Sequence, residues 1–246
     1  MDPLTAPIID AHSHLGDILY PGGGQLIGKK GVTKEPIFDL TTVSERSLHR
    51  DPFGLGRVLA PLLGRWATRG DRARNFTATL ENFKRSMEGT EITYSVCLPI
   101  PPHVTFSDLA PVAEKEPSVI PFTGVDYTKD DDPGPALAAD VRAGARGLKL
   151  HPIIQNVALT SERTRAAVAA FGAHGLPVLF HCGISSYYLG REKRREQPRY
   201  GKVRYAAELV QEFPEVRFIA GHAGLLQFRD AIRMLGDFRN VWVDTS

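Results

Sequence analysis

Short apolar runs alternate with longer amphipathic stretches along most of this chain. Seven of the short runs have the length and the β-branched content of buried strands. They cover residues 8–12, 92–99, 119–126, 147–151, 177–181, 216–222 and 241–245. Because these runs are strongly apolar, we expect strands that are covered on both faces, as in a parallel sheet.

Amphipathic stretches separate these runs and predict helices over residues 71–87, 107–115, 133–143, 161–174, 200–213 and 225–235. One stretch has clear end signals, because Thr160 can cap its start and Gly175, just before Pro177, can end it. Strands joined by single helices predict an α/β fold, and this many repeats predict a TIM-barrel-like (β/α)8 arrangement. Seven strands are visible and the eighth is missing from this chain.

We predict a single domain over residues 1–246, with one long insertion at residues 15–70 after the first strand. Such insertions form lids, oligomer contacts or small satellite cores. Apolar residues that could form a face there are Phe53, Leu55, Leu59, Leu62, Leu63 and Trp66. The letters GGQLIGK at residues 23–29 resemble a phosphate-binding loop, but Lys30 replaces the required Ser or Thr, so phosphate binding is not expected.

The composition and net charge of the chain limit the classes of partner that it is expected to bind. The chain has 42% hydrophobic and 24% charged residues, which is typical of globular proteins, and its formal net charge is only +2. We therefore expect a small-molecule substrate, with no nucleic acid and no membrane as a partner. Two cysteines are too few for a disulfide framework, and no targeting segment is apparent, so we expect a cytoplasmic protein. A homo-oligomer is left open.

Five of the eight histidines lie at the ends of predicted strands, where the active sites of barrels collect. They are His12, His14, His151, His181 and His222. Strand side chains alternate between faces, so His12 and His14 project from one face and can bind one cation together. The other three, His49, His103 and His174, fall in predicted loops or helices.

An ordered series of motifs carries a family resemblance. It consists of IIDAHSHLG at residues 8–16, RGLKLHP at 146–152, LFHCG at 179–183, AGHAG at 220–224 and NVWVDTS at 240–246. The series resembles the amidohydrolase superfamily, and within it the amidohydrolase-related (amidohydrolase-2) metal-dependent hydrolases and decarboxylases. The resemblance implies that His12, His14 and His181 bind one divalent metal ion, usually Zn²⁺ with Mn²⁺ as the alternative. It places His222 beside the metal as a catalytic residue that polarises the substrate, or as a ligand of a second ion, and it places Lys149 and His151 in the substrate pocket.

The resemblance also exposes a departure. The family normally closes its barrel with an eighth strand that ends in an aspartate, which binds the metal and acts as general base. We expect this chain to be a C-terminally truncated fragment, or else a divergent or partner-completed barrel. Asp244 resembles a residue of the family's seventh-strand segment and is not expected to take the missing role. Asp10 is expected to orient an imidazole.

The reaction predicted from these residues is hydrolysis. Three neutral imidazoles leave a divalent metal Lewis acidic, so that metal-activated water can attack the carbonyl of a small ester, lactone or amide. One alternative is non-oxidative decarboxylation of a small aromatic or enoate carboxylic acid, and another is an inactive fragment.

Lys149 and the pair Arg194 and Arg195 leave alternatives open, whereas Cys182 does not. Lys149 could contact an anionic substrate, become a carboxylated bridging ligand, or pair with a buried acid such as Asp126. Arg194 and Arg195 belong to a charged run that is typical of a solvated surface but could capture an anionic substrate. Cys182 follows His181 directly, so alternation turns its thiol away from the site.

Overall fold

The computed structural model describes residues 6–37, 66–225 and 227–246. Its strands form two parallel sheets with the orders β1-β2-β3 and β4-β5-β6-β7-β8. These strands are β1 (Ile8–Ser13), β2 (Ile92–Cys97), β3 (Val119–Pro121), β4 (Thr123–Gly124), β5 (Leu148–Leu150), β6 (Val178–Phe180), β7 (Phe218–Ala220) and β8 (Val241–Val243). All seven predicted strands are present, and the third is divided into β3 and β4.

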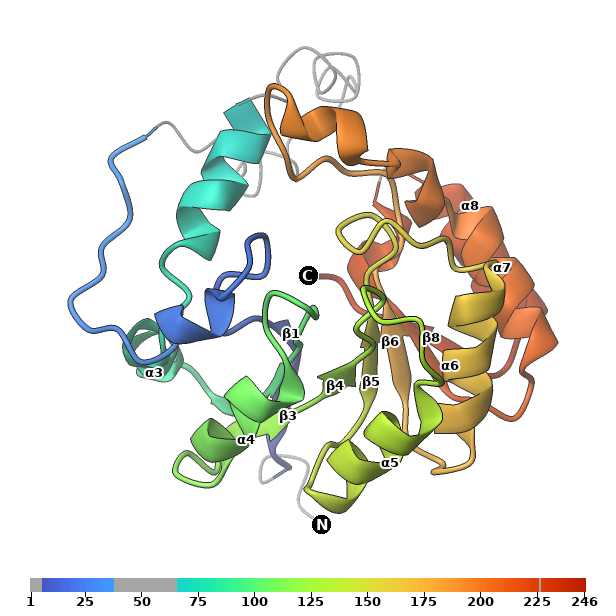
Figure 1. Cartoon of the computed structure of the whole chain (residues 1–246), viewed down its shortest axis with the longest axis horizontal. Helices are drawn as coiled ribbons and strands as arrows, with labels where there is room; N and C mark the ends of the chain where they lie inside the picture. Colours follow the sequence, from blue (N-terminus) through green and yellow to red (C-terminus); the bar gives the residue numbers. More distant parts are fainter. Residues whose placement is uncertain (1–5, 38–65, 226) are drawn as a thin grey trace.

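The division of the third strand joins the two sheets. The Phe122 amide donates to the Cys97 carbonyl oxygen at 3.1 Å, whereas the Thr123 amide donates to the Gly147 carbonyl oxygen at 2.8 Å. The backbone thus changes its hydrogen-bonding partner from the end of β2 to the start of β5 between two adjacent residues. The two sheets therefore continue into one curved wall (Figure 1). Within the described part of the chain, β1 and β8 each have a strand neighbour on one side only, so the wall is not closed.

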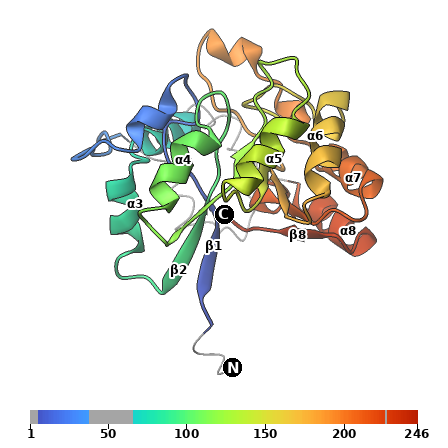
Figure 2. The ribbon, with the colours of Figure 1, turned by 60° about the horizontal axis from the view of Figure 1, so that its bottom comes forward.

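Helices lie along the outer side of this wall (Figures 1 and 2). They are α3 (Leu80–Met87), α4 (Phe106–Ala113), α5 (Gly134–Arg142), α6 (Glu162–Gly172), α7 (Val203–Glu212) and α8 (Phe228–Asp237), and residues 66–75 are also helical. Parallel strands with helices outside them confirm the α/β, TIM-barrel-like prediction. No helix in the described ranges is long and apolar enough to cross a bilayer.

Two helix predictions need correction. A single helix over residues 71–87 is wrong, because the chain turns at residues 76–79 and Thr79 caps a new helix by accepting a hydrogen bond from the Asn82 amide at 3.1 Å. The cap of α6 is Ser161 and not Thr160, since the Ser161 hydroxyl accepts from the Thr164 amide at 3.2 Å. Both errors reflect local capping bonds that compete with the helical period.

The predicted insertion is described only in part. Phe53, Leu55, Leu59, Leu62 and Leu63, and also His49, lie outside the described residues. The glycine-rich segment of residues 23–29 begins with a short 3-10 helix, Gly23–Leu26, which follows a turn and not a strand. A Cβ atom on Gly23 would lie 1.8 Å from the Asp17 carbonyl oxygen, so this glycine permits close backbone packing.

The core follows the alternation of the strands. Leu148 and Leu150 pack in a cluster on the helix side of the wall, so Lys149 between them faces the opposite, inner side. A smaller cluster that includes Val96, Leu98, Phe122 and Leu179 occupies the inner side. Cys182 belongs to the helix-side cluster, which confirms that its thiol faces away from the site.

Truncation of a residue in the helix-side core should be costly. Phe171 on α6 is fully buried, so Phe171→Ala should lower the free energy of unfolding by about 3–5 kcal/mol. Phe228→Ala on α8 is the matched control, because Phe228 is 55% exposed. Urea denaturation measures both, and equal losses would contradict the assignment of Phe171 to the core.

Candidate active site

The five predicted histidines meet at the carboxyl edge of the wall. The ring centroids of His12 and His222 are 4.6 Å apart, and those of His12 and His14 are 5.4 Å apart. His181 lies 4.9 Å from His222 and 4.5 Å from His151 by the same measure. The predicted convergence of the strand-end histidines is confirmed, because parallel strands end at one edge.

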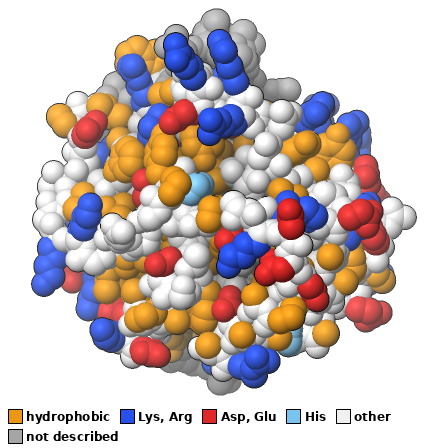
Figure 3. Space-filling model, viewed as in Figure 1, with side chains coloured by type: hydrophobic (Ala, Val, Ile, Leu, Met, Phe, Trp, Pro, Cys, Tyr) orange, Lys and Arg blue, Asp and Glu red, His pale blue; other side chains and the backbone are white. Residues whose placement is uncertain are grey.

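A cavity of about 360 Å³ opens over four of these rings. It is lined by His12, His14, Ile18, Leu19, Asp71, Arg72, Arg74, Asn75, Ala78, His151, Tyr187, His222 and Ser246. His181 and Lys149 lie beneath it, since their side chains are almost fully buried. Figure 3 shows a histidine surface near the centre of this face, bordered by hydrophobic side chains.

His12 is held by a carboxylate from the far end of the chain. Its Nδ1 donates to Asp244 Oδ2 at 2.8 Å, and Asp244 also accepts from the His222 amide at 2.9 Å and the Ser246 hydroxyl at 2.7 Å. Burial works to raise the pKa of Asp244, but the hydrogen bond and charge of His12, with the other two donors, hold that pKa well below its usual value. Asp244 is therefore ionised and fixes the hydrogen of His12 on Nδ1.

Asp10 does not orient an imidazole as expected. Its carboxylate accepts from the His12 backbone amide at 3.1 Å and from the hydroxyls of Ser13 and Ser95 at 2.5 and 2.6 Å. These bonds fix the backbone at His12 instead of its ring. The two serine hydroxyls and the backbone amide are thus the partners that this carboxylate finds in place of a ring.

His14 is oriented by a backbone carbonyl. Its Nδ1 lies 2.7 Å from the Leu98 carbonyl oxygen, which can only accept, so Nδ1 carries the hydrogen and Nε2 keeps its lone pair. Burial lowers the pKa of His14 well below 6.5, and the charges of His12 and Lys149 lower it further. The ring is therefore neutral, as metal binding requires.

Lys149 contacts His12 from below the cavity. Its Nζ lies 3.2 Å from His12 Nε2, so an ammonium group already faces the lone pair of this ring. Burial lowers the pKa of Lys149 to about 7, although the charge of Asp244 partly opposes the shift. The suggested pairing with Asp126 is not found, because Asp126 instead lies 3.9 Å from Lys129.

His151 and His222 also have defined hydrogen positions. His151 Nδ1 accepts from the Ile154 amide at 3.2 Å, so Nε2 carries the hydrogen of the neutral ring. His222 Nδ1 lies 2.9 Å from the Ser246 carbonyl oxygen, so this nitrogen donates and Nε2 keeps a lone pair. Burial, followed by the charge of Lys149, lowers the pKa of His222.

The loop after β6 supplies residues that the sequence analysis missed. The Tyr187 hydroxyl lies 3.3 Å from His181 Nδ1, and the carboxylate of Glu196 accepts from the Tyr188 amide at 3.0 Å. By contrast, Glu192–Arg195 is a 3-10 helix with no buried residue, and neither Arg194 nor Arg195 lines the histidine cavity. Arg194 and Arg195 thus lie on a solvated surface, whereas Glu196 at the end of the run contacts the backbone at Tyr187 and Tyr188.

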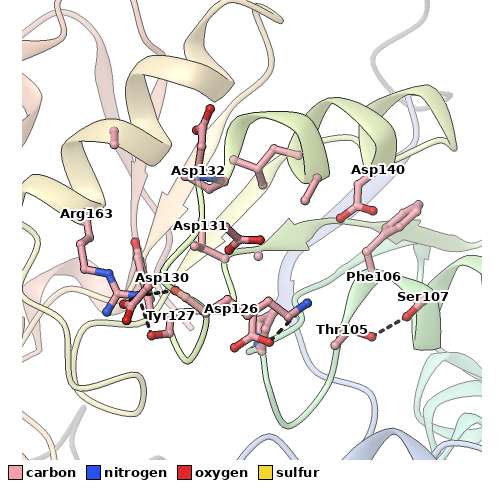
Figure 4. A pocket seen from close by; sticks show the side chains of 18 residues that line it. Thr105, Phe106, Ser107, Asp126, Tyr127, Asp130, Asp131, Asp132, Asp140 and Arg163 are labelled. Atoms are coloured by element: carbon pink, nitrogen blue, oxygen red, sulfur yellow. Dashed lines mark hydrogen bonds and ion pairs between the residues drawn. The ribbon is translucent and has the colours of Figure 1, made fainter.

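A larger cavity of about 720 Å³ lies between α4 and α5 (Figure 4). Carboxylates line it, among them Asp126, Asp131 and Asp140, but none of the histidines does. Arg163 donates to the Tyr127 carbonyl oxygen at 2.6 Å and lies 3.6 Å from Asp130. We place the chemistry in the smaller cavity, where the neutral imidazoles are.

The histidine cluster fits a divalent cation. His12, His222 and Asp244 offer ligand atoms that lie within 4.8 Å of one another. Asp244 is hydrogen-bonded to His12 Nδ1 and so acts as the outer partner of that ring, while His12 Nε2, which faces Lys149 Nζ at 3.2 Å, is the nitrogen that a cation would bind. His14 has the same arrangement, with Leu98 as its outer partner. Metal-binding histidines usually have such a partner on the second ring nitrogen.

Parallel strands with helices outside them and polar residues at the carboxyl edge of the strands are the layout of a TIM-barrel-like protein. The sequence profile of the amidohydrolase family matches residues 9–246, and the chain belongs to this family. The family resemblance stated from the sequence motifs is therefore confirmed. No curated protein matches the chain.

Solved structures share the fold. An uncharacterized TIM-barrel protein from Bordetella bronchiseptica has a TM-score of 0.59 at 16% identity, over 98% of this chain and 75% of that one. A probable 2-pyrone-4,6-dicarboxylic acid hydrolase from Acinetobacter baumannii, with citric acid bound, has a TM-score of 0.53 at 12% identity, over 98% and 70%. The 5-carboxyvanillate decarboxylase from Novosphingobium aromaticivorans, complexed with manganese, has a TM-score of 0.53 at 13% identity, over 90% and 66%.

The buried imidazoles should make stability depend on pH. Burial, followed by the charge of Lys149, lowers the pKa of His12 from 6.5 to about 4. Between these two pH values the His12 ring is therefore protonated in the unfolded chain and neutral in the folded chain. The stabilisation is complete above the unfolded pKa and is lost as the pH falls from about 6.5 toward about 4. His12→Gln should flatten this dependence in urea denaturation of the chelator-treated protein. His174→Gln, which removes an exposed imidazole, is the control, and an unchanged slope for His12→Gln would contradict the prediction.

Proposed function

We propose that this chain is a metal-dependent hydrolase that acts on the carbonyl group of a small ester, lactone or amide. The hydrogen bond from His12 Nδ1 to Asp244 carries this proposal, because it keeps the hydrogen of the neutral ring on Nδ1 and so directs the Nε2 lone pair, which now faces Lys149, to a cation. His12, His14 and His181 are the proposed ligands, as the family resemblance implies. When bound, a divalent cation supplies a Lewis acid that makes water nucleophilic near neutral pH.

Zn²⁺ is the proposed metal and Mn²⁺ the alternative. Imidazole nitrogens suit both the borderline zinc ion and other first-row metals, so the ligands alone favour neither strongly. The manganese in the related decarboxylase supports the alternative. A divalent cation at His12 Nε2 would replace the contact of Lys149 Nζ, which lies 3.2 Å from that nitrogen.

His222 is the proposed general base. Its Nδ1 donates to the Ser246 carbonyl oxygen, so the Nε2 lone pair can accept the proton of the attacking water. Water then adds to the carbonyl carbon, the bond to the leaving group breaks, and the proton passes from His222 to the leaving oxygen or nitrogen. His151, which lines the cavity with its hydrogen on Nε2, is the proposed donor to a substrate oxygen. We propose that Lys149 acts through His12, because it is 1% exposed and does not line the cavity.

A second candidate function is non-oxidative decarboxylation of a small carboxylic acid. Arg72 and Arg74 line the same cavity as the histidines, and guanidinium groups match carboxylates in geometry and charge. Arg72 is held in place by Tyr20, whose hydroxyl it contacts and over whose ring its guanidinium lies at 5.2 Å. The substrate proposed for either reaction therefore carries an anionic group.

Metal content and turnover test the main proposal. We expect about one zinc or manganese ion per purified chain by elemental mass spectrometry, and loss of this ion in the His12→Ala, His14→Ala double variant. We expect His222→Gln to retain the metal but to lower kcat for activated esters or lactones by about 10²–10⁴-fold. Loss of the ion in His222→Gln would make this residue a ligand instead of the base. A folded wild-type chain that binds no added metal would favour the inactive-fragment alternative.

A comparison of charged and neutral substrates tests whether Arg72 recognises a carboxylate. Arg72→Gln should raise KM for a substrate that carries a carboxylate by about 10-fold or more, and should change KM little for the neutral analogue. Arg69→Gln is the matched control, because Arg69 is exposed on the same helix and does not line the cavity. Carbon dioxide release from hydroxylated benzoates, assayed in parallel, distinguishes decarboxylation from hydrolysis. Equal effects of Arg72→Gln on both substrates would remove the role of Arg72 in recognising charge.

A further inference from the structure

Three segments meet at the rim of the histidine cavity. They are the loop after β1, the helix of residues 66–75 and the loop after β6 (Figure 1). The Tyr188 hydroxyl donates to the Leu19 carbonyl oxygen at 3.1 Å, and the Thr68 hydroxyl donates to the Ser186 carbonyl oxygen at 3.1 Å. Hydrogen bonds thus connect the loop after β6 with both of the other segments.

Tyr20 lies where these three segments meet. Its ring is stacked with that of Phe76, with centroids 6.3 Å apart, and is nearly perpendicular to that of Tyr188, with centroids 6.2 Å apart. The guanidinium carbon of Arg72 lies 5.2 Å from the centroid of the same ring. One ring or cation from each neighbouring segment therefore holds Tyr20 in place, and its hydroxyl has a defined position.

A directed chain of hydrogen bonds runs through the Tyr20 hydroxyl. Arg72 Nη2 donates to the hydroxyl oxygen, and the hydroxyl donates its single hydrogen to Glu192 Oε2 at 3.0 Å. The direction is fixed, because a guanidinium group can only donate and an ionised carboxylate can only accept. Burial, followed by the hydrogen bond to Glu192, raises the pKa of Tyr20, so the hydroxyl keeps the hydrogen that this chain requires.

Glu192 therefore acts as a counter-ion of Arg72 from outside the cavity. Arg72 Nη1 lies 3.9 Å from Glu192 Oε2, and the two side chains are 24% and 49% exposed. Arg72 lines the cavity, whereas Glu192 is not among the described residues that line it. A carboxylate that enters the cavity can still reach Arg72, but it meets a guanidinium whose charge is partly balanced and a second carboxylate at the rim.

We propose that Glu192 is a specificity-determining residue, which weakens the binding of anions at Arg72 and so favours substrates with one carboxylate over substrates with two. The fork of one guanidinium group accommodates one carboxylate. A second carboxylate on the ligand is repelled by Glu192 and gains no equivalent bond to Arg72, so it is disfavoured. This inference rests on the proposed function, because it takes the anionic group of the substrate to bind at Arg72.

Removal of the Glu192 charge tests the inference. Glu192→Gln keeps an oxygen that can accept from Tyr20 but removes the negative charge. We would titrate the purified protein with benzoate, isophthalate and neutral benzamide, and follow binding by ligand-observed proton NMR. We expect Glu192→Gln to lower the Kd of benzoate by about 2–5-fold, as for a partly exposed ion pair. The Kd of isophthalate should fall by a larger factor, and that of benzamide should not change.

Two further variants separate this charge effect from a structural one. Glu212→Gln is the matched control, because Glu212 is 42% exposed and pairs with Arg165 at 2.7 Å on the outer side of the wall. It should change none of the three affinities. In the Arg72→Gln background, Glu192→Gln should no longer tighten benzoate binding. In about 1 M sodium chloride the effect of Glu192→Gln should also shrink, because salt screens exposed charges.

Each outcome of the titration decides a different point. Unchanged or weaker benzoate binding by Glu192→Gln, or the same change for benzoate, isophthalate and benzamide, would overturn the inference and leave the proposed function intact. Equal factors for benzoate and isophthalate would overturn the preference for one carboxylate. A wild-type protein that binds benzoate no better than benzamide would instead overturn the anionic substrate of the proposed function, and the inference with it.

Discussion

The hydrogen bond between His12 and Asp244 connects the two ends of an open wall. His12 lies on β1 and Asp244 directly follows β8, and these strands have no neighbour on their facing sides in the described part of the chain. One carboxylate there fixes an imidazole hydrogen and also accepts from the His222 amide. The arrangement of the histidine cluster depends on this bond, because it positions one ring directly and a second through the backbone.

Burial then determines the charge of the cluster. Imidazoles withdrawn from water lose their proton more readily, and each ring near Lys149 is also disfavoured as a cation by the ammonium charge. Neutral rings at distances of 4.5–5.4 Å do not repel one another as charged rings would. The cost of gathering several histidines is therefore small once they are neutral, and their lone pairs become available to a cation.

The sequence predicted the strands and the meeting of the histidines because both follow from short-range rules. Alternation along a strand and the shared carboxyl edge of parallel strands were sufficient to bring His12, His14, His151, His181 and His222 together. Glu196 and Tyr187 were not predicted, because their positions depend on the path of the loop after β6. A glutamate inside a run of arginines is normally solvated, and only the three donors of residues 186–188 explain its burial.

His12 and Asp244, which form the hydrogen bond described above, are 232 residues apart in the chain. A contact between such distant residues forms late, since the entropy of closing so long a loop must be met before the contact stabilises anything. During synthesis His12 emerges long before Asp244, so its ring has no carboxylate partner until β8 has left the ribosome. Metal binding at this site would thus report that β1 and β8 have come together, which ties assembly of the site to a contact between distant parts of the wall.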